Sequence, residues 1–129
     1  ALGTVVYLEY GSALTSDSTL WHDSLALYRE LDDKWGMAYV LARLAEKTSY
    51  RAEFDMATEL YLESLQLTEL LGQPYQLVWP LLHLGRIAAR QAQFREGERQ
   101  LHKGLRVSRE LNYRIGITGA LYYLGEISL

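Results

Sequence analysis

The sequence has no cysteine, only two prolines, and no run of 18 apolar residues in its 129 positions. Without cysteine it cannot form disulfides, thiolate nucleophiles, cysteine-ligated iron–sulfur clusters or cysteine-type zinc sites. Its apolar stretches are too short to cross a bilayer, and it does not open with the basic and then apolar segments of a secretory signal. We therefore expect no membrane-spanning segment. Of the compartments left open, the lack of cysteine favours the cytoplasm.

The sequence also lacks a large excess of charge of either sign, because 13 Lys and Arg stand against 16 Asp and Glu and the net charge is −3. With 49% hydrophobic and 22% charged residues, the composition excludes global disorder and suffices for a packed core. No recognition-helix motif or RNA-binding signature is present, and the basic excess is confined to residues 74–113. These features disfavour direct binding of nucleic acid.

Catalytic motifs are missing as well: there is no glycine-rich phosphate loop, no H-E-x-x-H pair and no G-x-S-x-G elbow. His22, His83 and His102 fall in three predicted helices, and a pairing of His83 with His102 would lack a carboxylate ligand. Glu46 and Glu126 could face one groove, but nothing specifies the tight, buried setting that paired acids need for catalysis. We expect no catalytic residue, no metal site and no cofactor.

The chain repeats itself with a 40-residue step, which carries Leu31 onto Leu71 and Leu71 onto Leu111. The copies are residues 1–33, 34–73, 74–113 and the opening half of another at 114–129, with no Pro-, Gly- or Ser-rich linker between them. The first copy matches if one residue is deleted in a loop. Other recurring sets include Ser24-Leu25, Ser64-Leu65 and Gly104-Leu105; Leu41, Leu81 and Leu121; and Ala45, Gly85 and Gly125.

Within each copy, apolar residues follow the period of an α-helix. In the second copy one stripe runs from Phe54 to Leu71, with polar residues such as Glu59 on the opposite face. A second stripe, from Ala38 to Ala45, precedes it, so each copy is predicted to be an antiparallel helical hairpin. The seven expected helices lie near residues 1–11, 13–31, 34–49, 53–71, 75–91, 94–111 and 114–128.

The predicted helix ends carry turn residues. Gly72 fits the left-handed position that closes a helix, and Pro74 fits the start of the next one. The pairs Asp32-Asp33 and Asn112-Tyr113 occupy the matching turns in the other copies.

Pro80 conflicts with the fifth helix. Inside a helix, proline removes a hydrogen bond and clashes with the carbonyl four residues back, at a cost of about 3 kcal/mol. We expect this helix to start in effect at Leu77, which would place Pro80 in the first turn, or to kink. Strain retained for function is the less favoured alternative.

Small residues at Ala57 and Gly97, aromatic residues at Phe54, Phe94 and Tyr61, and tandem hairpins resemble the tetratricopeptide repeat over essentially the whole chain. The 40-residue period, with Leu-Tyr-Arg-Glu-Leu-Asp-Asp-Lys-Trp-Gly at 27–36, resembles the longer variant of bacterial signalling ATPases and large transcriptional regulators. The resemblance implies a right-handed α-solenoid of about three and a half repeats, in which the first helix of each hairpin lines a concave groove. A lone hairpin of this size cannot bury its apolar face, so neighbours are expected to stack.

By that geometry, side chains flanking the packing stripe of each first helix point into the groove. Most are aromatic residues or arginines, which are enriched at interface hot spots. The groove is therefore predicted to bind a peptide or a partner helix, although Trp79 and Tyr122 could instead complete the core. The candidate residues are Tyr39, Arg43, Glu46, Tyr50, Trp79, His83, Arg86, Arg90, Tyr122, Tyr123 and Glu126.

Two further features bear on the partner. The family's clamp for C-terminal carboxylates is disfavoured, because Ala42, Leu82, Glu46 and Arg86 stand at the positions of its Lys and Asn residues. The first three copies hold one base against six acids, four against six, and seven against three, so their net charges are −5, −2 and +4. This gradient could steer an acidic ligand to the third copy or let chains associate head to tail; ordinary solvated helix faces are the simpler alternative.

The chain starts at Ala1 and stops at Leu129, inside a predicted helix whose apolar stripe has no following partner. We expect either a piece of a longer protein or a homo-oligomer that covers this helix. The predicted function is a protein-interaction or ligand-sensing scaffold without chemistry of its own, within a larger bacterial regulatory protein. The alternative is a structural or oligomerisation unit that associates through its end helices.

Overall fold

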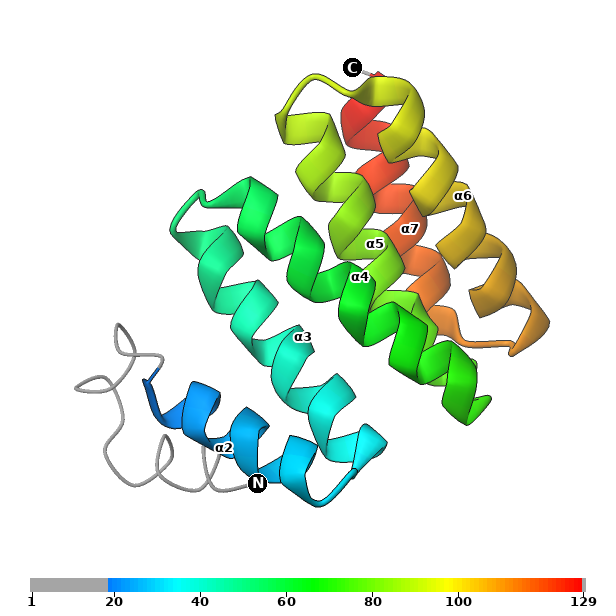
Figure 1. Ribbon diagram of the computed structural model, residues 1–129. Helices are drawn as coiled ribbons and strands as arrows, with labels where there is room; N and C mark the ends of the chain where they lie inside the picture. The colour runs from blue at the N-terminus through cyan, green and yellow to red at the C-terminus, as the bar shows by residue number, and fades with distance from the viewer. Residues whose placement is uncertain (1–18, 129) are drawn as a thin grey trace. The chain divides into compact units, whose positions relative to one another are not determined.

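The computed structural model describes residues 19–128, and every regular element in this range is a helix (Figure 1). The predicted all-α fold class is therefore confirmed. The helix expected at 1–11 and the start of the one expected at 13–31 lie outside the described residues; the other boundaries agree closely with the expected ones. The helices are α2 (Thr19–Glu30), α3 (Lys34–Tyr50), α4 (Phe54–Leu71), α5 (Tyr75–Arg90), α6 (Phe94–Glu110) and α7 (Arg114–Ser128).

The turns between these helices share one backbone conformation at a regular spacing of half a repeat. Each has one residue in the left-handed region, with φ between 52° and 67°. The predicted left-handed Gly72 is confirmed, and Asp32 and Asn112 adopt the same conformation in the matching turns. Ala52 and Ala92, which were not predicted to be left-handed, adopt a φ of 61° in the turns within hairpins. A helix plus its turn is thus the basic unit, and two such units make one repeat.

Common hydrogen bonds close these turns. The amide of Glu53 donates to the carbonyl of Thr48 at 3.1 Å, and the equivalent bond one repeat later, from Gln93 to Ala88, measures 2.8 Å. This arrangement satisfies a carbonyl that the end of the helix would otherwise leave free. At the start of α3, the carboxylate of Asp33 accepts a hydrogen bond from the amide of Gly36 at 3.0 Å and caps the helix.

The first compact unit, Ala1–Leu67, has an apolar core between α2 and α3. Trp21 and Leu25 of α2 are buried there against α3. Helix α4 is tied to α3 by Ser64, whose hydroxyl donates to the carbonyl of Ala38 at 2.8 Å. The α3 residues in this core are Met37, Val40, Leu41 and Leu44.

The second compact unit, Thr68–Leu129, contains α5, α6 and α7, which lie side by side (Figure 1). Helices α5 and α6 approach each other closely at Gly85 and Gly97, where a Cβ atom on either residue would lie 2.9 Å from the other's carbonyl oxygen. Two turns further on, Gly104 makes room for the side chain of Leu82. The buried apolar core of this unit is Val78, Leu82, Leu101, Leu105 and Ala120.

The extent to which side chains are buried recurs every 40 residues, as the sequence does. Because equivalent positions are buried to nearly the same extent, the sequence repeat is a repeat of packing positions. One set is Trp21, Tyr61 and Leu101, exposed by 3, 2 and 0%; another is Leu25, Leu65 and Leu105, exposed by 5, 6 and 6%.

The expected late start of the fifth helix is wrong. Helix α5 begins at Tyr75, and the amide of Leu77 already donates to the carbonyl of Pro74 at 3.1 Å. Pro80 therefore lies inside the helix and cannot donate to the carbonyl of Gln76. The carbonyl of Gln76 is thus left without its helical donor, and the proline ring is buried.

Candidate functional site

A pocket of about 220 Å³ opens in the second unit between α5, α6 and α7. It is smaller than the roughly 300–1,000 Å³ typical of small-molecule sites, so it suits one or two side chains of a partner better than a whole ligand. Its lining residues are Arg86, Ala89 and Arg90 of α5, Phe94 and Leu101 of α6, and Tyr123, Glu126 and Ile127 of α7.

Helical spacing explains why these side chains meet. Arg86 and Arg90 are four residues apart and share one face of the last turns of α5. Tyr123 and Glu126, three residues apart, share the facing side of α7. Phe94 is the first residue of α6 and reaches the pocket directly from the turn. The pocket thus combines an apolar wall with two cationic side chains.

The arginines of the pocket are not neutralised by ion pairs among residues 19–128. The guanidinium carbon of Arg86 lies 5.2 Å from the ring centroid of Tyr123, a cation–π contact that leaves the positive charge intact. Neither Arg86 nor Arg90 makes an ion pair with a described carboxylate, although Glu126 also lines the pocket. An anionic group entering the pocket would therefore meet guanidinium donors without competition from an existing pair.

The repeat-equivalent position in α3 differs in this respect. There, Arg43 and Glu46 form an ion pair at 3.3 Å within one helix, so the two charges cancel locally. In α5 the residues at these positions are His83 and Arg86, neither of which is acidic. The cationic character is consequently a feature of the third copy and not of the repeat in general.

Trp79 belongs to the core of the second unit. Its indole N–H donates to the hydroxyl of Tyr113 at 3.0 Å, and its ring packs against Gly119. His83 lies beside it, with the two ring centroids 6.0 Å apart. Tyr122, by contrast, is 65% exposed. The alternative that these residues complete the core therefore holds for Trp79 but not for Tyr122.

Some of the predicted groove residues line the pocket and others do not. The pocket brings together four of them, Arg86, Arg90, Tyr123 and Glu126. Tyr122 lies at the edge of this set, with its ring centroid 5.6 Å from that of Tyr123 in an edge-on arrangement.

The remaining candidates lie on α3 in the first unit. Tyr39 and Tyr50 are exposed there, at 45% and 81%. Arg43 and Glu46 are engaged with each other. These four residues line no part of the pocket.

Four of the residues that line the pocket were not predicted to be site residues. Phe94 was named only among the residues that carry the family resemblance, and it is 52% exposed. Leu101 and Ile127 are apolar residues on packing stripes, and Ala89 has no distinctive chemistry. Phe94 shares its helix-start position with Phe54, which is half-buried, so that position alone does not mark a site residue, and the other three have no sequence signal.

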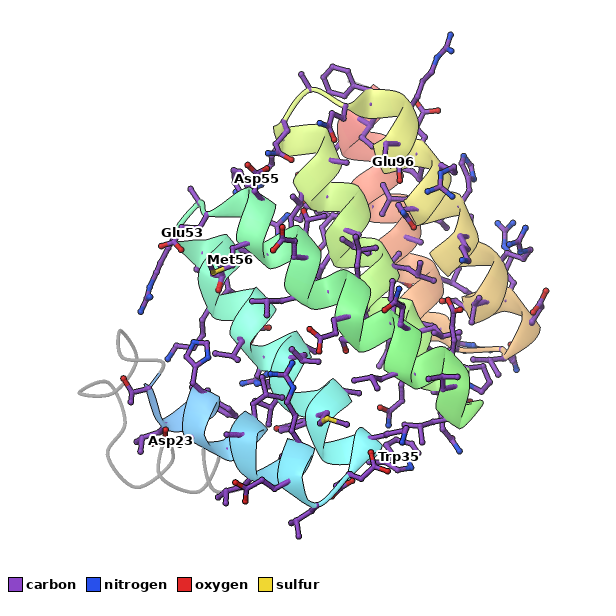
Figure 2. All side chains as sticks on the ribbon, viewed as in Figure 1. Asp23, Trp35, Glu53, Asp55, Met56 and Glu96 are labelled. Atoms are coloured by element: carbon purple, nitrogen blue, oxygen red, sulfur yellow. The ribbon has the colours of Figure 1, made fainter. Side chains whose placement is uncertain are left out.

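Acidic residues gather at helix starts outside the pocket. Figure 2 shows Glu53 and Asp55 at the beginning of α4, and Glu96 near the beginning of α6. At such positions carboxylates interact favourably with the helix dipole. Glu96 also pairs with Arg99 at 2.7 Å, and the hydrogen bond from Arg99 lowers the pKa of its carboxyl below the ordinary value.

Within residues 19–128, no three His, Asp or Glu side chains are grouped as a metal site would require. In the same range, no helix combines the length and apolarity needed to pass through a bilayer. Comparison with protein-family models found no match, and comparison with curated proteins found none either.

Proposed function

We propose that this chain is a protein-interaction scaffold that binds a peptide or a partner helix, with the α5–α6–α7 pocket receiving an acidic side chain and an apolar neighbour from the partner. The observation that carries the proposal is that Arg86 and Arg90, which form no ion pair with another described residue, meet Phe94 and Tyr123 around one pocket. Arginine and aromatic side chains of this kind contribute disproportionately to binding energy at interfaces.

Size and charge support a protein partner over a small ligand. The pocket volume of about 220 Å³ accommodates a few side-chain groups. Residues 74–113 carry seven basic against three acidic side chains, which favours the approach of an acidic partner. The lining holds a single carboxylate, Glu126, so it does not supply a pair of acids for general acid–base chemistry. We therefore propose binding rather than catalysis.

The wider assignment rests on the resemblance to long tetratricopeptide repeats. The regular spacing of the left-handed turns and the recurrence of burial from one copy to the next support a repeat scaffold. On this basis we propose a cytoplasmic role within a larger bacterial regulatory protein.

The test is a selection of short peptides from a random phage-displayed library, followed by titration of the selected peptides by fluorescence anisotropy. We expect enrichment of peptides with Asp or Glu next to an aliphatic or aromatic residue. The double variant Arg86→Ala/Arg90→Ala should weaken their binding about tenfold or more, because the charged contacts lie beside an apolar wall.

The matched control is Arg106→Ala/Arg109→Ala. It removes the same two charges from exposed positions of α6 that do not line the pocket. This variant should change affinity less than about threefold, since exposed charges contribute little. An equal loss in both double variants would indicate binding by overall charge and would contradict the pocket proposal. Far-ultraviolet circular dichroism should show unchanged helicity in both.

A further inference from the structure

One face of α7 repeats a face that α5 buries. Shifting α5 by one repeat places five of its eight buried residues on exposed residues of α7. On α5 the face consists of Val78, Leu81, Leu82, Gly85 and Ala88, which are all buried. On α7 it consists of Thr118, Leu121, Tyr122, Gly125 and Ser128, which are all exposed. We call this set the α7 open face.

Helix α6 covers part of the corresponding face of α5. A Cβ atom on Gly85 would lie 2.6 Å from the Leu101 side chain and 2.9 Å from the Gly97 carbonyl oxygen. A Cβ atom on Gly104 would lie 2.7 Å from the Leu82 side chain. The α5–α6 contact thus depends on small residues that let the two backbones approach.

The α7 open face is shaped for the same kind of contact but has no such neighbour among the described residues. A Cβ atom on Gly125, the repeat equivalent of Gly85, would meet nothing within 4 Å. Leu121 and Tyr122 are 49% and 65% exposed, whereas Leu81 and Leu82 of α5 are 1% and 0% exposed. The face carries no charged side chain.

The chain itself shows which helices fit such a face. The two second helices that the structure describes in full, α4 and α6, share a buried pattern: a small residue, a large apolar residue four positions later, then a small residue, a leucine and a hydroxyl residue. In α4 these are Ala57, Tyr61, Ser64, Leu65 and Thr68, and in α6 they are Gly97, Leu101, Gly104, Leu105 and Ser108.

We propose that the α7 open face docks an amphipathic α-helix with this pattern, with its first small residue and its large apolar residue against Gly125 and its second small residue against Leu121 and Tyr122. The docked helix would repeat on α7 the contact that α6 makes with α5. This face is separate from the pocket, which is lined by Tyr123, Glu126 and Ile127 of the same helix.

The probe is a synthetic peptide with the sequence of residues 93–112, titrated into the isotope-labelled chain and followed by amide chemical shifts. We expect the amides of Leu121 and Gly125 to shift, while that of Gly85 stays unchanged. Peptide with Gly97→Leu and Gly104→Leu should bind about tenfold more weakly or worse, because these changes prevent close approach.

Two variants of the chain test the face directly. Gly125→Leu fills the place of the incoming backbone, and Leu121→Gln removes apolar contact; each should weaken binding about tenfold or more. The control is Ile115→Gln, which also removes an exposed apolar side chain from α7 but repeats Tyr75, an exposed residue of α5. It should change affinity less than about twofold.

Three outcomes would overturn the proposal. The first is no shift on the α7 open face at millimolar peptide. The second is a shift of Gly85, which would mean that the peptide replaces α6 instead of docking on α7. The third is a stable dimer of the free chain, detected by sedimentation, that Gly125→Leu dissociates, since a second copy would then cover the face. Because Arg86→Ala/Arg90→Ala leaves this face intact, it should bind the peptide normally, so failure here is distinguishable from failure of the pocket proposal.

Discussion

Gly85 and Gly97 place the backbones of α5 and α6 in direct contact, each glycine standing where a side chain would meet the other's carbonyl oxygen at 2.9 Å. Gly125 occupies the same repeat position as Gly85, yet no described residue would come within 4 Å of a Cβ atom placed on it. The pair Gly85 and Gly125 therefore separates the effect of a glycine on packing from its effect on the helix.

Replacing Gly85 with alanine should destabilise the chain by about 1–2 kcal/mol, because the overpacking cost exceeds the better helix propensity of alanine. Replacing Gly125 with alanine should stabilise it by about 0.5–1 kcal/mol, since only the propensity changes. Urea unfolding followed by circular dichroism measures both free energies. If Gly125→Ala proves destabilising, the α7 open face is covered in solution.

The turn alanines are predicted to be sites of stabilisation. Ala52 and Ala92 adopt a φ of 61°, where a Cβ atom is strained and glycine is not. Ala52→Gly and Ala92→Gly should each raise the melting temperature and the free energy of unfolding, the latter by about 0.5–1 kcal/mol.

Two opposite substitutions serve as controls for the turns. Ala42→Gly, in the interior of α3, should cost about 1 kcal/mol. Gly72→Ala should also destabilise the chain, by about 1 kcal/mol. Its φ is 67° and its Cβ position is open, so only backbone conformation is affected. Stabilisation by Gly72→Ala would contradict the left-handed turn.

Buried serine hydroxyls offer a second matched pair. The hydroxyl of Ser64 donates to the Ala38 carbonyl, whereas the buried hydroxyl of Ser108 has no hydrogen-bond partner within the described part of the chain. Ser64→Ala should therefore destabilise by about 1 kcal/mol, and Ser108→Ala should be neutral or stabilising by up to about 1 kcal/mol. Thermal and urea unfolding of the two variants, measured side by side, decide the point. A clear loss of stability in Ser108→Ala would show that this hydroxyl is hydrogen-bonded in solution.

The ion pair of Glu96 and Arg99 predicts a small dependence of stability on acidity. The hydrogen bond from Arg99 lowers the pKa of the Glu96 carboxyl in the folded chain. The stabilisation it brings is therefore present above the ordinary glutamate pKa and is lost as the pH falls through the folded value. Its size should be small, because both side chains are substantially exposed and screened by salt.

Glu96→Gln should accordingly reduce the fall in the free energy of unfolding as the pH drops through and below the ordinary glutamate pKa, and Arg99→Ala should have a similar effect. Urea midpoints across that range provide the measurement. Added sodium chloride should reduce the difference between wild type and variant. If the free energy of unfolding falls with pH equally in wild type and both variants, this ion pair does not contribute to the pH dependence.

Much of the fold was predictable because it follows from local periodicity. The helical stripe in α4 predicted the burial of Ala57, Tyr61 and Leu65, and the positions do lie in the core. Gly72 predicted its left-handed turn because glycine reaches that conformation without strain. Ala52 and Ala92 carried no such signal, since alanine ordinarily favours a helix interior.

The candidate site was predictable only in part. Helical spacing placed Arg86 and Arg90 on one face, and the repeat placed Tyr123 and Glu126 on the equivalent face of α7. The role of Phe94 could not be predicted, because its repeat partner Phe54 is half-buried while Phe94 itself is exposed at the pocket.

By itself, the sequence determined that the chain is helical, where its helices end and which stripes are apolar, because these properties depend on neighbours three or four residues away. Only the tertiary structure decided which of these stripes are covered. Burial depends on what another helix brings to a face, so Gly85 is closed by α6 while Gly125, its equivalent, stays open. For the same reason Arg86 lines the pocket, whereas Glu46, its equivalent in α3, forms an ion pair with Arg43 of the same helix.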